Sequence, residues 1–258
     1  MNNHFFTSLS LILCVYSSTC SANETLPVGV ALFPPFQYFE DQVLVGSDTE
    51  ILTQVLDEVG YKPSFYIRPW KRILAEGKLG KYALIFSLTK NKEREANFYF
   101  SDPINAVRDV FFKRKDRQIQ WNTLEDVAHL IVSASEGYNY SNSFMLASKY
   151  KISRMSWVVG DRPEMKHLSL LQSGQVDIAI CEIHVCLHLI RSNPDKFNQL
   201  DYIDKSIGPK RYFHAAISKN WPNSKKLLKA FNQSLMKFIK SGKRDKILRK
   251  YKFIMPTD

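Results

Sequence analysis

The feature that most constrains the fold of this chain is an alternation of short apolar runs with amphipathic segments. In the first half, apolar runs typical of strands are separated by segments whose apolar residues recur every three or four positions, as in helices. The expected strands are Leu26–Leu32, Ser64–Ile67 and Tyr82–Ser87, and the expected helices are Asp48–Gly60 and Pro69–Glu76. Strands that alternate with helices predict βαβ units and a mainly parallel sheet.

The same alternation recurs in the second half, after the run that ends at Lys113. The expected strands and helices follow in the order Leu130–Ser133, Ser141–Tyr150, Met155–Val159, Pro163–Gln172, Val176–Ile180 and Glu182–Arg191. The chain then returns through the apolar run Arg211–Ser218 and ends in two amphipathic patterns, Asn223–Lys240 and Asp245–Tyr251. Two successive alternations predict two α/β lobes.

A ligand cleft between the lobes is expected from the residues that directly follow the predicted strands. Ligands of open α/β sheets bind beyond the carboxyl ends of the strands, and two facing lobes can close over them. The residues in such positions, which we expect to converge on one cleft, are Phe36, Thr89, Gly137 and Glu182.

Residues 1–22 have the pattern of a secretory signal peptide. They contain no Asp, Glu, Lys or Arg, and they carry the apolar segment Leu9–Tyr16 followed by small residues up to Ala22. The apolar segment is too short to span a membrane. We therefore expect cleavage after Ala22 and a mature protein in the periplasm.

The formal net charge of +11 lies entirely outside this leader. A basic balance can indicate a nucleic-acid or anionic-membrane partner. Much of the excess, however, lies between Lys225 and Lys252, where apolar residues such as Leu227 and Phe231 recur at helical spacing. Such a pattern is better explained by a basic amphipathic helix packed on its own core, and an exported protein meets little nucleic acid. No nucleic-acid partner is expected.

Two cysteines, Cys181 and Cys186, lie outside the leader. An oxidising compartment would permit a disulfide, but a helix that begins near Glu182 would hold the two Cα atoms more than about 7 Å apart. We therefore expect two buried thiols. Cys181, His184 and His188 would also share one helical face with ligands suited to zinc, but their spacing matches no common zinc pattern, and packing is the favoured interpretation. No metal or cofactor is expected.

A hydroxyl and an arginine follow the predicted strand that ends at Ser87. Thr89 stands five residues before Arg94. A guanidinium can bind a carboxylate through two parallel charge-assisted hydrogen bonds, and a nearby hydroxyl can fix its orientation. The alternative is a solvated charge run formed with Lys90, Lys92, Glu93 and Glu95, which residue types alone favour. The position of Arg94 after a strand and opposite Glu182 favours the carboxylate site.

Several short motifs stand in a characteristic order along the chain. They are Pro34-Pro-Phe36, Gly46-Ser-Asp-Thr-Glu50, Pro69-Trp70, Ser87-Leu-Thr89 with Glu93-Arg94, Phe100-Ser-Asp-Pro103, Ser173-Gly-Gln-Val-Asp177 and Ser241–Tyr251. In order and spacing they resemble the extracellular solute-binding proteins of family 3, the polar amino-acid-binding components of ABC importers. The resemblance covers about residues 25–252.

The resemblance implies an α/β, two-lobe periplasmic-binding-protein fold of type II, with the ligand cleft between lobes joined by two hinge strands. We expect lobe one to comprise residues 24–110 and 213–258, and lobe two residues 114–210. The hinge strands are expected near Phe111–Arg114 and Arg211–His214.

The resemblance also implies roles for individual residues. Phe36 would pack on the ligand, Thr89 and Arg94 would hold its α-carboxylate, and the backbone at Gly137 and Tyr138 would supply N–H donors. Glu182 stands where the family has an aspartate that takes the α-ammonium, and it is one methylene longer. The full set of expected ligand-binding residues is Phe36, Trp70, Ser87, Thr89, Arg94, Gly137, Tyr138 and Glu182.

The function expected from these observations is capture of a small amino acid or related zwitterion by cleft closure. The expected partner is the membrane permease of an ABC importer, and the expected state is a monomer. Two alternatives stay open. One is a cyclohexadienyl-dehydratase-like enzyme with Glu182 as base, and the other is a sensory or interaction protein whose cleft is plugged by Tyr138 and Tyr140.

Overall fold

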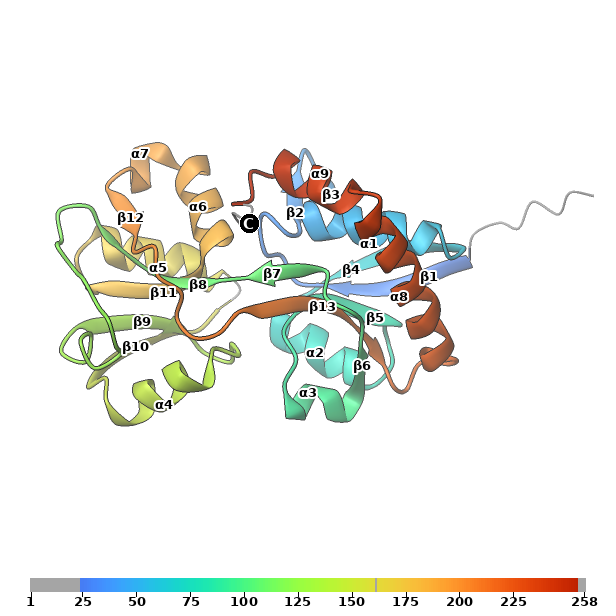
Figure 1. Cartoon of the computed structure of the whole chain (residues 1–258), viewed down its shortest axis with the longest axis horizontal. Coiled ribbons are helices and arrows are strands. Elements are labelled where there is room, and N and C mark those ends of the chain that lie inside the picture. Colours follow the sequence, from blue (N-terminus) through green and yellow to red (C-terminus); the bar gives the residue numbers. More distant parts are fainter. Residues whose placement is uncertain (1–23, 161, 255–258) are drawn as a thin grey trace, which may run out of the picture.

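The computed structural model describes residues 24–160 and 162–254. These residues form two α/β lobes, each built on a large mixed sheet, together with a small β-hairpin (Figure 1). The expected signal peptide, residues 1–22, lies outside the described residues. Within the described ranges, no helix is both long and apolar enough to cross a bilayer.

The first sheet has the strand order β4-β1-β5-β13-β6, with β7 paired to β13. Its parallel part comprises β1 (Glu24–Val30), β4 (Tyr61–Ile67) and β5 (Leu84–Leu88). Its antiparallel strands are β6 (Phe98–Phe100), β7 (Asn105–Val107) and β13 (Arg211–Ser218). The prediction of a parallel βαβ core is therefore confirmed, and the returning strand Arg211–Ser218 adds an antiparallel part.

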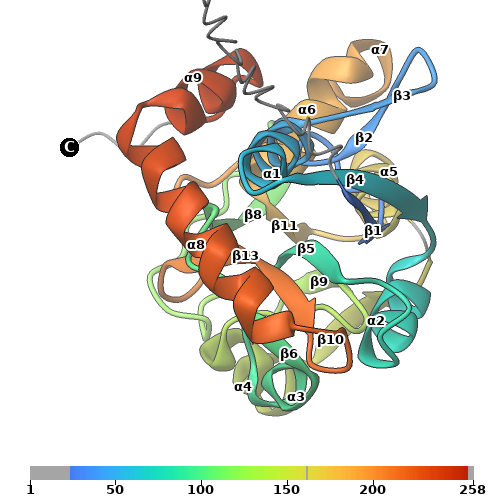
Figure 2. The same cartoon turned by 90° about the vertical axis from the view of Figure 1, so that its right-hand side faces the viewer.

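Helices cover both faces of this sheet (Figure 2). The helices α1 (Ser47–Asp57), α8 (Ser224–Lys240) and α9 (Lys243–Lys250) pack on one face, and α2 (Trp70–Lys78) and α3 (Lys92–Asn97) on the other. Alternate side chains of β5 serve the two layers, because Leu84 and Phe86 belong to the core under α1 and α8 while Ile85 packs under α2. A strand buried on both faces explains the continuous apolar run in the sequence.

The second sheet has the strand order β10-β9-β11-β8-β12. Its strands are β8 (Asp109–Arg114), β9 (Ile131–Ser135), β10 (Arg154–Val158), β11 (Ile178–Glu182) and β12 (Leu200–Tyr202). On one face lie α5 (Pro163–Gln172), α6 (Ile183–Ser192) and α7 (Pro194–Phe197), and on the other lies α4 (Asn142–Tyr150) (Figure 1). The hairpin β2 (Tyr38–Glu40) and β3 (Val43–Val45) belongs to the first lobe.

The chain crosses between the lobes where β7 leads into β8 and where β12 leads into β13 (Figure 1). The first crossing lies at residues 107–109. The expected hinge strand Phe111–Arg114 was placed too late, because these residues are already paired with β11 and β12 inside the second sheet. The second crossing lies between β12 and β13, and the expected hinge strand Arg211–His214 was likewise placed too late, because these residues are already paired with β7 and β5 in the first sheet.

The expectation of two free thiols is wrong. Cys181 and Cys186 form a disulfide with their Cα atoms 6.3 Å apart. β11 continues through Glu182 and α6 begins only at Ile183, so Cys181 stays in the strand while the first turn of α6 brings Cys186 back towards it. This geometry lies within the Cα separation that a disulfide spans.

We predict that the double variant Cys181→Ser, Cys186→Ser loses about 2 kcal/mol of unfolding free energy, because the bridge closes only a short loop. Urea unfolding of a chain that begins at residue 23 measures this loss, with reduced wild type as control. Thiol titration of the unreduced, unfolded wild type should find no free thiol, and two free thiols would contradict the disulfide.

Candidate functional site

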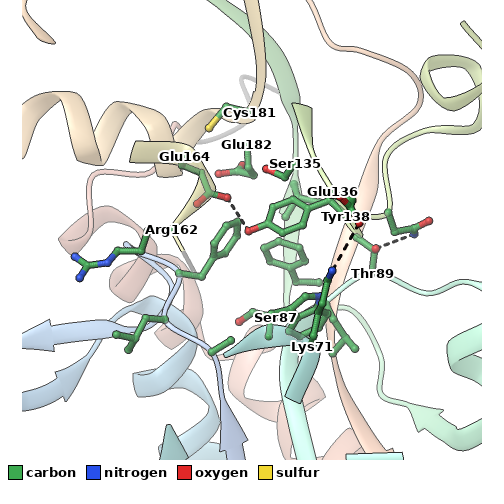
Figure 3. A pocket seen from close by; sticks show the side chains of 18 of the residues that line it. Lys71, Ser87, Thr89, Ser135, Glu136, Tyr138, Arg162, Glu164, Cys181 and Glu182 are labelled. Atoms are coloured by element: carbon green, nitrogen blue, oxygen red, sulfur yellow. Dashed lines mark hydrogen bonds and ion pairs between the residues drawn. The ribbon is translucent and has the colours of Figure 1, made fainter. Parts of the chain in front are cut away.

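A cavity of about 510 Å³ lies between the two lobes. Most of its lining residues lie at or just beyond the carboxyl ends of the parallel strands β1, β4, β5, β9, β10 and β11, as the topology requires. Figure 3 shows side chains of both lobes pointing into it. Six of the expected site residues line the cavity, namely Trp70, Ser87, Thr89, Arg94, Tyr138 and Glu182.

Arg94 is a buried cation in this cavity. It lies on α3, a short helix that the sequence did not predict, where the Asn91 side chain caps the helix by accepting the Arg94 N–H at 2.8 Å. Only 7% of Arg94 is exposed, whereas the charged residues around it, Lys90, Lys92, Glu93 and Glu95, are exposed. The interpretation as a solvated charge run is therefore excluded for Arg94.

The Arg94 guanidinium is oriented by its neighbours but carries no ion pair. Its Nη1 donates to the Thr89 carbonyl at 2.8 Å and to Thr89 Oγ1 at 3.3 Å, and the guanidinium lies 5.3 Å from the Trp70 ring. Burial lowers the pKa of Arg94 to about 10. Among the described residues, no carboxylate lies within salt-bridge distance of it, although Arg211 in the same cavity is paired with Asp109 and Lys71 with Glu136.

Glu182 is placed in the cavity wall, but its carboxylate is occupied. It caps α6, because Oε2 accepts the N–H groups of His184 and Val185 at 2.8 and 3.1 Å. Its Oε1 lies 2.9 Å from His184 Nδ1 and accepts the Arg108 N–H at 3.4 Å. A carboxylate has about four acceptor positions, so these four contacts leave none free for a ligand ammonium.

The cysteine and the two histidines considered as zinc ligands make other contacts in the structure. Cys181 is bonded to Cys186, and His184 contacts Glu182 and accepts the Ile254 N–H at 3.1 Å. The His188 ring lies 5.0 Å from the Tyr38 ring.

Ser87 lines the cavity, but its hydroxyl belongs to a buried network in the first lobe. Ser87 has a left-handed backbone with φ of 57°, and its Oγ lies 2.6 Å from Asp48 Oδ2 and 2.8 Å from Gln37 Oε1. One hydroxyl proton cannot serve both acceptors, but a protonated Asp48 would donate to Ser87 and free its proton for Gln37. Burial raises the pKa of Asp48 from 3.8 to about 7, which agrees with this arrangement.

We predict that Asp48 makes the fold less stable as the pH rises. A carboxyl whose pKa is raised by folding favours the folded state when protonated, so its contribution is lost from about pH 4 through pH 7. Between pH 5 and 8 the wild type should lose about 3 kcal/mol relative to Asp48→Asn. Urea unfolding at both pH values measures this difference, and parallel pH profiles for the two proteins would contradict it.

Phe36 and Gly137 do not line this cavity. Phe36 is fully buried behind Phe33, which takes the expected place in the wall. The Ser47 and Asp48 N–H groups hold the turn by donating to the Pro35 and Phe36 carbonyls at 3.0 Å. Gly137 has φ of 78° and forms the turn after β9, which leaves the lining to its neighbours.

The cavity is also lined by residues that no sequence pattern marked as candidates. They include Phe33, Asp109, Asn139, Glu164 and Arg211. In the sequence, Glu164 is an acidic residue of the kind favoured in the first turn of a helix, and Arg211 is the first residue of a predicted strand. Asn139 crosses from the second lobe and donates to Thr89 Oγ1 at 2.9 Å. No local pattern marks these residues, because the cavity forms only when distant loops meet.

A family model described as bacterial extracellular solute-binding proteins, family 3, matches residues 26–254. The chain belongs to this family. The L-cystine-binding protein TcyA of Bacillus subtilis (strain 168) is 24% identical over 166 residues, which are 64% of this chain and 59% of TcyA. The match thus spans less than two thirds of that relative.

Solved structures of such binding proteins share the fold. An ancestral arginine-binding protein bound to arginine is 25% identical with a TM-score of 0.75, covering 89% of this chain and 99% of that one. AbpA, an amino acid ABC transporter substrate-binding protein from Streptococcus pneumoniae Canada MDR_19A bound to L-arginine, is 25% identical with a TM-score of 0.73, covering 88% and 94%. The expected two-lobe, type II fold is confirmed.

Proposed function

We propose that this solute-binding protein captures a small amino acid or a related zwitterion in the cavity between its lobes. The observation that carries the proposal is Arg94, a buried guanidinium that lines the cavity and has no carboxylate partner among the described residues. Burying an unpaired charge costs free energy, and a ligand carboxylate would offset that cost through two charge-assisted hydrogen bonds. The Thr89 hydroxyl stands beside Arg94 to share this carboxylate.

Contacts between the lobes support a mechanism of cleft closure. Asn139 bonds to Thr89, Lys71 lies 3.7 Å from Glu136, and the Tyr138 and Phe33 rings meet edge to face. A ligand that bridges both lobes would stabilise this closed arrangement relative to an open one. We further propose that the exported, periplasmic protein delivers its ligand in the closed form to the permease of an ABC importer.

The relatives support the same ligand class. TcyA is named for binding L-cystine, and the two structures above hold arginine. These ligands share the carboxylate and ammonium of an amino acid and differ in their side chains. We therefore propose the amino-acid class and leave the side chain to experiment.

The dehydratase alternative has less support from the geometry. A general base needs a free lone pair directed at the substrate, and the four contacts around the Glu182 carboxylate leave none. Proton NMR of the protein mixed with cyclic carboxylic acids would distinguish the two functions, since an enzyme converts its substrate and a binding protein releases it unchanged.

A thermal-shift screen of the chain from residue 23 tests the proposed function. Amino acids, amines and amine-free carboxylic acids are compared at equal concentration. A zwitterion present at 100 times its Kd should stabilise the protein by about 2.7 kcal/mol and raise the melting temperature. Absence of any shift with the amino acids would contradict the proposal.

A further inference from the structure

Four acidic residues line the cavity, and three of them are already engaged. Asp109 is paired with Arg211, Glu136 with Lys71, and Glu182 accepts or contacts four donors. The fourth, Glu164, lies in the first turn of α5 in the second lobe and is 7% exposed.

Glu164 has neutral partners only. Its Oε1 accepts the Tyr138 hydroxyl at 2.7 Å, and its own backbone makes a local hydrogen bond to the carboxylate. Figure 3 shows Tyr138 reaching Glu164 across the pocket. Among the described residues, no Lys, Arg or His lies within salt-bridge distance of this carboxylate. The Tyr138 bond fixes its position but leaves the negative charge uncompensated, and burial raises its pKa accordingly.

The cavity therefore holds a buried cation without an anion and a buried anion without a cation, one from each lobe. Arg94 comes from α3 of the first lobe, and Glu164 comes from α5 of the second. A single zwitterionic ligand would satisfy both charges, whereas a direct ion pair between them is not formed. The complementarity also explains how a ligand would favour closure, since its two charges would join the two lobes.

We propose that Glu164, held by the Tyr138 hydroxyl, receives the cationic group of the ligand, and that Glu182 instead positions α6. This assignment rests on the proposed function. The ligand class is a carboxylate that also carries an ammonium or guanidinium group able to reach from Arg94 to Glu164. Tyr138 is a positioning residue in this arrangement as well as part of the wall.

Isothermal titration of L-arginine, L-glutamine and L-cystine into wild type, Glu164→Gln and Glu182→Gln tests the assignment. Gln keeps the size of Glu and removes the charge. The Glu164→Gln variant should therefore bind every probe that the wild type binds with an affinity lower by about 30-fold or more. Glu125→Gln, a change of the same charge on an exposed residue outside the cavity, is the matched control and should leave affinity unchanged. Melting curves verify that each variant is folded.

Tyr138→Phe provides a second readout. Loss of the hydroxyl should lower the affinity for the same probes by several-fold, because Glu164 loses the bond that holds it. The double variant Glu164→Gln, Tyr138→Phe should bind no more weakly than Glu164→Gln alone. The assignment is overturned, while the proposed function stands, if Glu164→Gln binds with wild-type affinity. It is also overturned if the 30-fold loss is found in Glu182→Gln and not in Glu164→Gln. If neither these probes nor any amino acid of the thermal-shift screen binds the wild type, the proposed function fails and the assignment fails with it.

Discussion

Replacing Arg94 with alanine should weaken binding of an amino-acid ligand by about 100-fold or more. The substitution removes both charge-assisted hydrogen bonds and leaves the buried ligand carboxylate without a cation, a change that typically costs 2–5 kcal/mol or more. Arg94→Lys should recover only part of the affinity, because an ammonium lacks the planar pair of donors. Isothermal titration with the best ligand of the screen measures both variants.

Lys92→Ala is the matched control for this prediction. Lys92 lies on the same helix and carries the same charge, but its side chain is exposed and does not line the cavity. The Lys92→Ala variant should bind the ligand with wild-type affinity. Equal losses in Lys92→Ala and Arg94→Ala would show that net charge or helix stability, rather than direct contact, governs the affinity.

Replacing Phe36 with alanine should lower the unfolding free energy by about 3–5 kcal/mol. Phe36 is fully buried, and its ring meets those of Phe33, Phe213 and Phe253 at centroid distances of 5.0–5.6 Å. It also packs with the apolar core of the second lobe, so the lost volume lies where the two lobes meet. Urea unfolding without ligand gives the loss directly.

Phe33→Ala separates the packing role from ligand contact. Phe33 is half-buried and lines the cavity, so its removal should cost less stability than Phe36→Ala but more ligand affinity. The reverse order, with Phe36→Ala folded normally and defective in binding, would restore Phe36 to the role that the family resemblance implied.

Most of the fold follows from periodicity. Patterns such as Asp48–Gly60 and Pro163–Gln172 predicted α1 and α5 because amphipathic helices leave a regular apolar face in the sequence. The helix α3 was missed because Lys92–Asn97 is short and polar, and only its Asn91 cap signals its start. The disulfide was missed because its geometry depends on where β11 ends, and a shift of the helix start changes the distance between the sulfurs.

The candidate site was predictable where one residue follows a strand and faces the cleft. Thr89 and Arg94 meet this condition, since they come from the segment after β5. The prediction that Phe36 lines the cavity was wrong, because the turn after β1 points its ring into the aromatic core and leaves Phe33 in the wall. Glu164 could not be selected, because a helix-start acid is common and its lack of a cationic partner appears only in three dimensions.

The central claim is that Arg94 holds the carboxylate of the ligand, and a crystal structure with the amino acid that gives the largest thermal shift tests it most directly. We expect the ligand between the lobes with its carboxylate oxygens about 2.7–2.9 Å from the Arg94 guanidinium. A ligand bound with its carboxylate on another group, and Arg94 still without an anion, would contradict the claim.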